Sequence, residues 1–277
     1  MEPLVELPIS KWPALQEKLK RLWPLNVAGY YALYLNLNYP GVREAFQFKV
    51  YCPYGDMDNG FVSINVKNDS QDCILFSTTQ DTSKLQEALV NTKLIDWRKK
   101  VCVDLVSSLI LKALENIRPR VMFSCYDVGL VMTYFLDRKT KPFDDVEYPP
   151  GTYLAPVKQH HIERIDSVWP YRYSGSKFYF STLSSNGLSY GLFSKSDELM
   201  AWLFLNEYNF LLHLYCEEGY RRKGYAEYVM KYVVNEQLKA GNDVYAYVVE
   251  GNDKPRRLFE KLGFVDVDKG AYIYVQK

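Results

Sequence analysis

The sequence has little that would place the protein in a membrane or on a nucleic acid. No stretch approaches the about 18 consecutive apolar residues that a transmembrane helix needs, and "VGLVMTYFL" is among the longest apolar runs. Neither sign of charge dominates, because 34 Lys and Arg stand against 33 Asp and Glu, which gives a formal net charge of +1. General nucleic-acid binders usually carry a strong basic excess. We therefore expect neither a membrane nor a nucleic acid as a partner.

Paired cysteine motifs are also missing. The number of cysteines is odd, their spacing is scattered, and no CxxC pair occurs. They are Cys52, Cys73, Cys102, Cys125 and Cys216. This pattern is typical of reduced thiols in an intracellular compartment, and it predicts neither a disulfide framework nor a zinc site. No cluster of His, Cys and Asp has metal-ligand spacing along the sequence, so we expect no metal.

The start of the sequence lacks the features of a targeting segment. The first ten residues, "MEPLVELPIS", carry early acidic residues and no cationic segment before an apolar run. A secretory signal needs that cationic segment, and a mitochondrial presequence is rich in Arg and poor in acids. We therefore expect a cytoplasmic protein.

What the sequence does contain is enough apolar material for a full core. Its 277 residues suffice for two domains of ordinary size, and 48% of them are hydrophobic. Aromatic residues make up 16%, including 24 Tyr. Such a number of tyrosines fits an aromatic-lined cleft, and it fits aromatic-rich strands equally well.

A charged, proline-rich segment divides the sequence into two halves. It is "DRKTKPFDDVEYPPGTY", residues 137–153, and it predicts a linker or a domain boundary. Periodicity in the first half predicts helices over 10–23, 82–91 and 101–117 and strands over 45–52, 60–66 and 73–78, with one or two strands over 120–136. The second half predicts helices over 155–171, 225–239 and 253–263 and strands over 188–194, 199–205, 210–216, 243–250 and 271–276. The fold class is therefore α/β or α+β.

A basic turn precedes the helix predicted over 225–239. Arg221, Arg222 and Lys223 stand just before it, where each cation costs about 0.3–1 kcal/mol against the helix dipole. The spacing of Gly219 and Gly224 is that of a P-loop, but no Lys and Ser or Thr follow, which excludes an NTPase. The turn is either a solvated basic loop or a site for a phosphate at the helix N-terminus.

Two motifs in the second half decide between these interpretations. Residues 221–226, "RRKGYA", match the R-x-x-G-x-A form of the acyl-CoA loop in acyltransferases of the GNAT superfamily. About thirty residues later, "VVEGNDKPRRLFEKLGF" resembles the next motif of that superfamily, an Asn after a strand and then a helix that ends in "EKLGF". The resemblance implies a GNAT fold, with a mixed central sheet flanked by helices.

The stretches "EEGYRRKGYAEYVMKY" and "LIDWRKKV" further resemble the glycine N-acyltransferase family, most clearly over 200–265 and more weakly before 150. This resemblance implies two tandem GNAT-like halves, a degenerate one over 1–145 and a catalytic, acyl-CoA-binding one over 150–277. It also implies a monomer or weak dimer, and the family would allow a mitochondrial location as well as a cytoplasmic one.

The chemistry that the resemblance implies is direct transfer from an acyl-CoA co-substrate to a small amine or amino acid. The amine attacks the thioester carbonyl in a ternary complex, which requires proximity, a base and a donor to the oxyanion. Backbone amides near residues 214–216 would hold the pantetheine and the oxyanion, and amides of 222–226 would hold the pyrophosphate. The acyl-CoA-binding residues implied are Leu214, Tyr215, Cys216, Arg221, Arg222, Lys223, Gly224, Tyr225, Ala226, Asn252 and Arg256.

The catalytic positions depart from the family pattern. The expected glutamate base is replaced by Phe210, and the expected tyrosine acid by Phe259. Glu207 is a candidate base acting through water, or else a solvated turn acid. His213 is a second candidate base, because its ordinary pKa of about 6.5 suits the role, or else a packed strand residue. Strict alternation places His213 on the strand face opposite Phe210 and residues 212 and 214.

Three further side chains in this region each have more than one possible role. Cys216 is interpreted as a small buried residue and not as an acyl-enzyme nucleophile, since direct transfer is the rule in this fold. Tyr245 and Tyr247 share one face of the next strand, where either could be an acid or a packing residue.

Three functions remain open at this point. The first is an N-acyltransferase of the glycine N-acyltransferase type. The second is a catalytically weak acyl-CoA-binding protein, which Phe210 and Phe259 favour. The third is an acetyltransferase for arylalkylamines or polyamines. The abundance of tyrosine mildly favours an aromatic acyl group or amine.

Overall fold

The computed structural model describes residues 1–67, 70–97, 101–121 and 125–276. Contacts divide them into two compact units. Unit 1 comprises Met1–Thr133, Val248–Asn252 and Asp266–Lys277, and unit 2 comprises Tyr134–Tyr247 and Asp253–Val265. The predicted division at 145–150 separates a degenerate half from a catalytic half, and it stays a prediction. The two units are instead defined by contacts between residues. Two short segments of the second half therefore count with the first.

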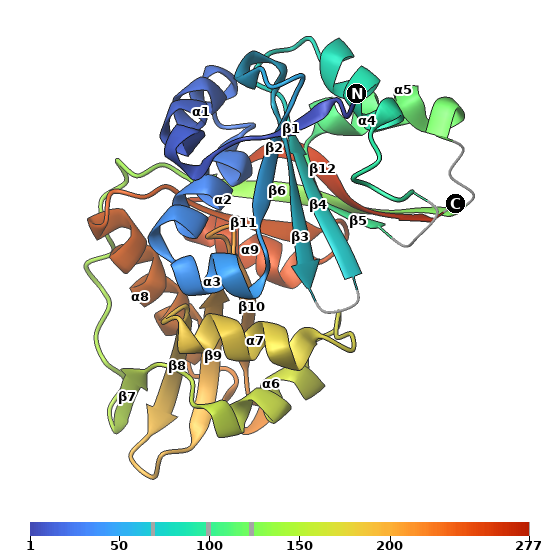
Figure 1. Ribbon diagram of the computed structural model, residues 1–277. Helices are drawn as coiled ribbons and strands as arrows, with labels where there is room; N and C mark the ends of the chain where they lie inside the picture. The colour runs from blue at the N-terminus through green and yellow to red at the C-terminus, as the bar shows by residue number, and fades with distance from the viewer. Residues whose placement is uncertain (68–69, 98–100, 122–124, 277) are drawn as a thin grey trace. The chain divides into compact units, whose positions relative to one another are not determined.

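An eight-stranded mixed sheet contains the strands of unit 1 and also β11, most of which belongs to unit 2 (Figure 1). Its order is β1-β2-β3-β4-β5-β12-β6-β11. The strands are β1 (Leu4–Glu6), β2 (Lys49–Pro53), β3 (Phe61–Lys67), β4 (Ser70–Phe76), β5 (Val101–Val106), β6 (Cys125–Leu136), β11 (Val244–Val249) and β12 (Val265–Gln276). β4 and β5 are parallel, while β1 to β4 pair antiparallel in sequence and β12 pairs antiparallel with β5.

Helices α4 (Ser83–Asn91) and α5 (Ser108–Val121) pack with one face of this sheet. Alternate strand residues such as Val62, Val103 and Ile273 join Leu85 and Leu114 of the helices in one apolar core. This is the period-two pattern that a half-buried strand requires. Helices α1 (Trp12–Leu19), α2 (Val27–Asn38) and α3 (Pro40–Ala45) complete unit 1.

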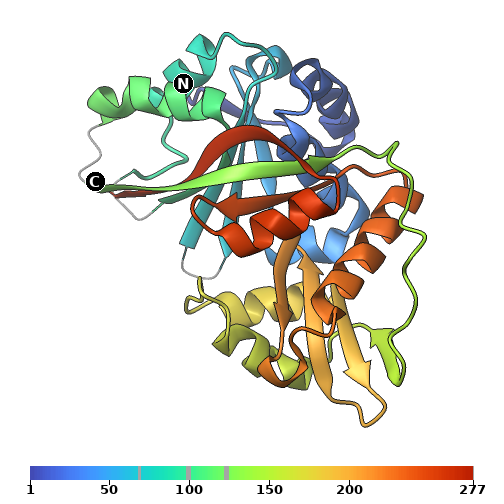
Figure 2. The same cartoon turned by 180° about the vertical axis from the view of Figure 1, so that it is seen from behind.

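Unit 2 is built on a four-stranded antiparallel sheet of order β10-β9-β8-β7. The strands are β7 (Thr152–Ala155), β8 (Ser189–Ser194), β9 (Leu199–Leu205) and β10 (Leu211–Cys216). Every residue of β9 is buried. Its helices are α6 (Ile162–Ser167), α7 (Ser176–Ser185), α8 (Tyr225–Lys239) and α9 (Asp253–Lys261). Figures 1 and 2 show α7 and α8 on opposite faces of this sheet, which explains why the inner strand β9 is apolar on both sides.

The predicted mixed α/β fold is confirmed, and several predicted elements are corrected. The segment over 101–117 is not one helix, because strand β5 occupies Val101–Val106 before α5 begins at Ser108. The helix predicted over 155–171 contracts to α6, preceded by a 3-10 turn at Gln159–His161. Helices α2, α3 and α7 were not predicted. No helix among the described residues is long and apolar enough to cross a bilayer.

Candidate functional site

β10 is an edge strand with a bulge. Among the described residues it pairs with β9 alone, and the register moves from Leu212 opposite Phe204 to Tyr215 opposite Trp202. Two residues of β10 therefore stand opposite one of β9, and His213 has a positive φ of 54°. A bulge leaves its extra residue outside the ladder of hydrogen bonds. The backbone between 212 and 215 can thus offer an amide to a ligand.

The basic turn after β10 has the backbone geometry of an anion site. Gly224 is the N-cap of α8 with a left-handed φ of 79°, and a Cβ added there would meet nothing within 4 Å. No protein acceptor, within the described part of the chain, receives the backbone N–H groups of Arg222 to Ala226. Free amides and the positive end of a helix dipole together favour a phosphate. The residues of this turn therefore fit a pyrophosphate.

The three cations of the turn play different parts. Arg221 folds back onto β10, where its Nε donates to Cys216 O at 3.1 Å and its guanidinium lies 5.5 Å from the ring centre of Tyr215. Arg222 is exposed, and Lys223 lies with its Nζ 5.4 Å from the Tyr220 ring. Arg222 and Lys223 are therefore the cations best placed to meet an anion in solvent, while Arg221 mainly holds the turn against the strand.

An acid in the first turn of α8 offsets part of this charge. Glu227 accepts from Lys261 Nζ of α9 at 2.6 Å and from Lys231 at 3.2 Å. The hydrogen bond from Lys261 is the largest cause that lowers the pKa of Glu227 below its ordinary value. A carboxylate near a helix N-terminus is favourable by itself. The predicted ligand Arg256 lies on α9, where it pairs with Asp253 at 3.2 Å.

Glu207 lies in the turn between β9 and β10 and is not a solvated acid. Its side chain is 1% exposed, and Tyr179 of α7 donates its hydroxyl to Glu207 Oε2 at 2.6 Å. Asn206 fixes the turn, because its Oδ1 accepts the backbone N–H groups of Tyr208 and Phe210 at 2.9 and 3.0 Å. A buried carboxylate needs such a donor. The proposed role of Glu207 as base stays a prediction. Its hydrogen-bond donor Tyr179 was not predicted from the sequence.

His213 is packed among aromatic rings. Its ring lies 5.3 Å from Phe180, 5.7 Å from Trp202 and 6.2 Å from Trp169, and its Nε2 donates to Ile165 O at 3.0 Å. Burial lowers the pKa of His213 to about 4. The imidazole is therefore neutral near pH 7. Its proposed role as base stays a prediction, with only Nδ1 left as the basic nitrogen.

Phe210 forms an aromatic cluster with the tyrosines of β11. Its ring centre lies 5.2 Å from that of Tyr247 and 6.1 Å from that of Tyr245, and the two tyrosine rings are 6.0 Å apart. Tyr245 donates its hydroxyl to the backbone oxygen of Tyr208. That hydroxyl is therefore engaged in holding the β9–β10 turn.

Phe259, at the position of the missing tyrosine acid, also has a tyrosine neighbour. The ring of Tyr134 stacks on it with centres 5.7 Å apart and 21° between the planes. The Tyr134 hydroxyl donates to Glu260 Oε1 at 3.4 Å. Tyr134 is distant in sequence, at the end of β6, so no local motif could have revealed it.

The remaining predicted ligands belong to β10 and to the turn before α9. Cys216 is half-buried at the end of β10, and burial raises the pKa of its thiol, which fits the interpretation as a packing residue. Leu214 and Tyr215 follow the bulge. Asn252 belongs to unit 1, where its backbone N–H donates to Val249 O at 3.0 Å in the turn before α9. Contact of these residues with acyl-CoA stays a prediction.

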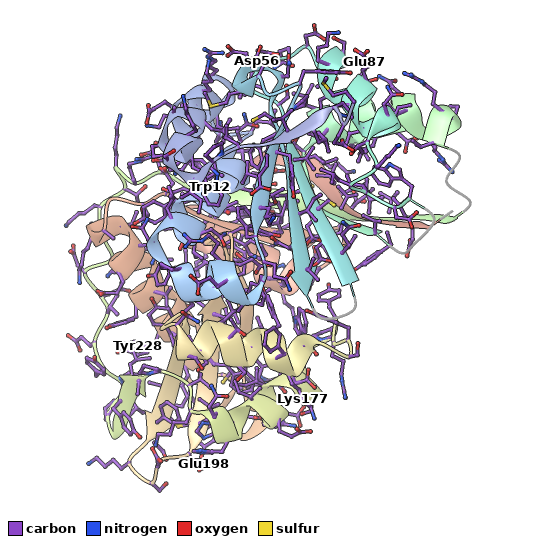
Figure 3. All side chains as sticks on the ribbon, in the orientation of Figure 1. Trp12, Asp56, Glu87, Lys177, Glu198 and Tyr228 are labelled. Carbon is purple, nitrogen blue, oxygen red and sulfur yellow. The ribbon has the colours of Figure 1, made fainter. Side chains whose placement is uncertain are left out.

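A cavity of about 530 Å³ opens beside the same turn. It is lined by the start of α6, the β8–β9 turn and the residues after β10, and Figure 3 labels Glu198 at its β8–β9 side. In one wall Arg164 forms a bidentate ion pair with Glu217, and both N–O distances are 2.7 Å. Tyr220 donates its hydroxyl to Glu198 at 2.5 Å. The charged side chains of the wall therefore largely satisfy one another.

One group of residues in unit 1 has metal-ligating atoms close together. One such atom from each of Asp72, Cys102 and Asp104 lies within 4.8 Å of the others, and Cys102 Sγ donates to Asp104 Oδ1 at 2.8 Å. The parallel pairing of β4 with β5 sets Asp72 opposite Cys102. Sequence spacing could not show this group, because its members come from two separate strands. The expected absence of a metal stays a prediction.

The comparisons with known proteins agree with this geometry. Residues 189–273 match the family model described as FR47-like protein, and residues 3–117 match a domain of unknown function, DUF5645. No curated protein matches the sequence significantly. The glycine N-acyltransferase subfamily therefore stays a prediction.

Solved structures match the chain over nearly its whole length. A Drosophila protein is 18% identical with a TM-score of 0.85, covering 99% of each chain. A GCN5-related N-acetyltransferase from Sphaerobacter thermophilus is 10% identical with a TM-score of 0.59, covering 99% of this chain and 94% of its own. A tandem GNAT protein from the clavulanic acid biosynthesis pathway is 11% identical with a TM-score of 0.58, covering 98% and 97%. The chain therefore has the GNAT fold.

Proposed function

We propose that the protein is an acyl-CoA-dependent N-acyltransferase. The observation that carries the proposal is the turn at Arg222–Ala226, whose free amides begin a 15-residue helix directly after a bulged edge strand. A helix N-terminus with free amides binds a phosphate. The match of residues 189–273 to the FR47-like model supports the same conclusion, because it spans this strand, turn and helix.

The residues of unit 2 fit the parts of an acyl-CoA. The amides of Arg222 to Ala226 would hold the pyrophosphate, and Lys223 and Arg222 would add charge-assisted contacts. The open edge of β10 would pair with the amide groups of the pantetheine arm, as an edge strand pairs with an added strand. The acyl-CoA supplies an activated carbonyl in the form of its thioester.

In the proposed reaction, the amine nitrogen forms an amide bond with the thioester carbonyl carbon, and the carbon–sulfur bond breaks. The thiolate leaves with the bonding pair. A base accepts the proton that the nitrogen loses and then passes it to solvent. An amide of the bulge at 213–214 would donate to the carbonyl oxygen as charge develops there. Glu207, held by Tyr179, would take the proton through water.

The acceptor that we propose is a small amine or amino acid of the glycine type. The experiment is release of free thiol from acetyl-CoA and benzoyl-CoA, each offered with glycine, other amino acids, arylalkylamines and polyamines. Release that depends on one class of amine would establish the reaction and name the acceptor. Failure to bind any acyl-CoA in a titration would contradict the proposal.

A second candidate is an acyl-CoA-binding protein with little turnover. It is favoured by the environments of Phe210 and Phe259, whose rings pack on other rings where a base and an acid would be expected. It is also favoured by Glu207, which is 1% exposed. This candidate predicts tight binding of acyl-CoA and no amine-dependent thiol release with any acceptor in the panel.

A further inference from the structure

The phosphate end of a bound acyl-CoA determines where its acyl end lies. The phosphates would lie at the N-terminus of α8, and β10 leads away from that point toward the β9–β10 turn. The six residues of β10 extend about 20 Å at about 3.3 Å per residue. A pantetheine arm paired along the open edge of β10 would bring the thioester to the bulge at 213–214, with the acyl chain directed toward the first residues of that strand.

The aromatic cluster occupies that end of the strand. Phe210 directly precedes β10, is 6% exposed and meets the ring of Tyr247 edge-on at 82°. Tyr245 is fully buried, and its ring completes a triangle with centre-to-centre distances of 5.2, 6.0 and 6.1 Å. Aromatic pairs in direct contact have centres about 4.5–7 Å apart. A further ring therefore cannot enter between these three unless they separate.

The cluster is held from behind by the turn that precedes β10. Tyr245 donates its hydroxyl to Tyr208 O, and Asn206 accepts the backbone N–H of Phe210 at 3.0 Å. Asn209 donates its Nδ2 to Gln237 Oε1 of α8 at 3.1 Å. These bonds fix the backbone that carries Phe210 and the side chain of Tyr245, so the cluster resists displacement toward the turn.

We propose that Phe210, Tyr245 and Tyr247 restrict the acyl group to a short aliphatic chain, such as acetyl or propionyl, and exclude aromatic and long-chain acyl groups. The inference rests on the proposed function, because it assumes that acyl-CoA lies along β10. It reverses the expectation of an aromatic acyl group that the composition favoured: these aromatic residues do cluster, but they pack against one another at centre distances that leave no room for another ring between them.

The test measures binding in the absence of any amine, so that it does not depend on turnover. The dissociation constants of CoA, acetyl-CoA, hexanoyl-CoA and benzoyl-CoA are determined by calorimetric titration. We expect acetyl-CoA to bind as tightly as CoA, and hexanoyl-CoA and benzoyl-CoA to bind about tenfold more weakly or worse, since one excess methylene in a filled pocket already has an effect of this size. Phe210→Ala should lower the dissociation constant of benzoyl-CoA about tenfold and leave that of acetyl-CoA unchanged.

A second variant and a control complete the experiment. Tyr247→Leu opens the same cluster from the opposite strand, which keeps the test valid if Phe210→Ala does not fold. Tyr153→Ala removes a ring from the stacked pair with Phe193 at the far edge of the same sheet and should change no acyl preference. Equal affinities for all four ligands, unchanged in both cluster variants, would overturn the inference alone. Failure to bind CoA itself would overturn the proposed function and, with it, the inference.

Discussion

The two units contain the same succession of strand, turn, helix and strand. In one unit the two strands pair with each other, and in the other they do not. In unit 1, β4 leads through α4 to β5, and the two strands pair in parallel register from Gln71 opposite Val101 to Ile74 opposite Asp104. In unit 2, β10 leads through α8 to β11, but β10 ends the four-stranded sheet and β11 ends the eight-stranded one. Only the second succession leaves a strand edge open to a ligand.

The turns before helices α4 and α8 also differ in whether they leave room for a ligand. The turn before α4 has no Gly and no basic residue, and the carboxylate of Asp81 accepts the backbone N–H of Ser83 at 2.9 Å. The turn before α8 has Gly224, three cations and amides without protein acceptors in the described chain. The protein's own carboxylate thus occupies the anion position at α4, whereas at α8 that position is left to a ligand. This difference supports the proposal that the first half is degenerate.

The largest effect is expected from the proposed base in the turn before β10. Glu207→Gln should lower kcat about a hundredfold or more, a usual contribution of a general base, and leave the affinity for acetyl-CoA unchanged. Initial rates and calorimetric titration measure the two quantities. Glu236→Gln, which removes an exposed carboxylate paired with Lys239 on α8, is the control. A fall in melting temperature with normal kcat would assign Glu207 to structure alone.

Reversing the charge of the open turn is the next strongest test of the comparison. Arg222→Glu combined with Lys223→Glu should weaken CoA binding by more than about a hundredfold, because two charge-assisted contacts contribute about 1.5–3 kcal/mol each. The remaining affinity should depend less on salt. Lys84→Glu makes the matching change in the first turn of α4 and should leave CoA binding as it is. Similar losses in both variants would mean that the two turns do not differ in function.

Burial of His213 in the bulge makes the stability of unit 2 depend on pH. His213 has its pKa lowered from 6.5 to about 4 by burial, so the unfolded chain binds this proton more readily than the folded one. The contribution is fully present above pH 6.5, and stability should fall by up to about 3 kcal/mol as the pH drops to 4. Denaturant unfolding of the protein and of His213→Gln over this range isolates the effect. Parallel pH curves for the two proteins would contradict it.

The smallest expected effect separates backbone strain from ligand contact. Gly224 and Gly241 stand at opposite ends of α8 with φ values of 79° and 76°, and neither has an atom within 4 Å of an added Cβ. Ala at either position should cost about 1–2 kcal/mol of stability. Only Gly224→Ala should also weaken CoA binding, about tenfold, because its Cβ obstructs the amides. Thermal unfolding and titration of both variants measure this, and equal CoA affinities would contradict an anion site at Gly224.

Local sequence patterns predicted the elements around the site well. The strands β8, β9 and β10, the helix α8 and the strand β11 lie within a residue or two of their predicted bounds, because each has a clear period and a Gly or polar boundary. Helix α7 escaped prediction because "SKFYFSTLSS" is rich in Ser, which competes with the helix by bonding to the backbone. Apolar residues recur throughout 101–117, so the pattern had no break to mark the change from strand to helix at Ser107.

The features that define the site were less visible in the sequence. A bulge is one extra residue and has no composition of its own, so alternation applied across His213 and Leu214 fails at that point. The partners Tyr179 and Tyr134 come from α7 and β6, far along the chain from Glu207 and Phe259. The same is true of Asp72 and Cys102, which meet only through the parallel register of β4 and β5.

The place of β12 has a consequence for how the chain is made. β12 lies between β5 and β6 in the sheet, so the middle of unit 1 is completed by residues 266–276. A ribosome delivers the N-terminal segment first, yet β5 meets its antiparallel neighbour only after nearly all of unit 2 has been synthesised. The two units are therefore coupled in folding time, and a nascent chain stalled before residue 266 would expose an unpaired β5 edge to chaperones or to aggregation.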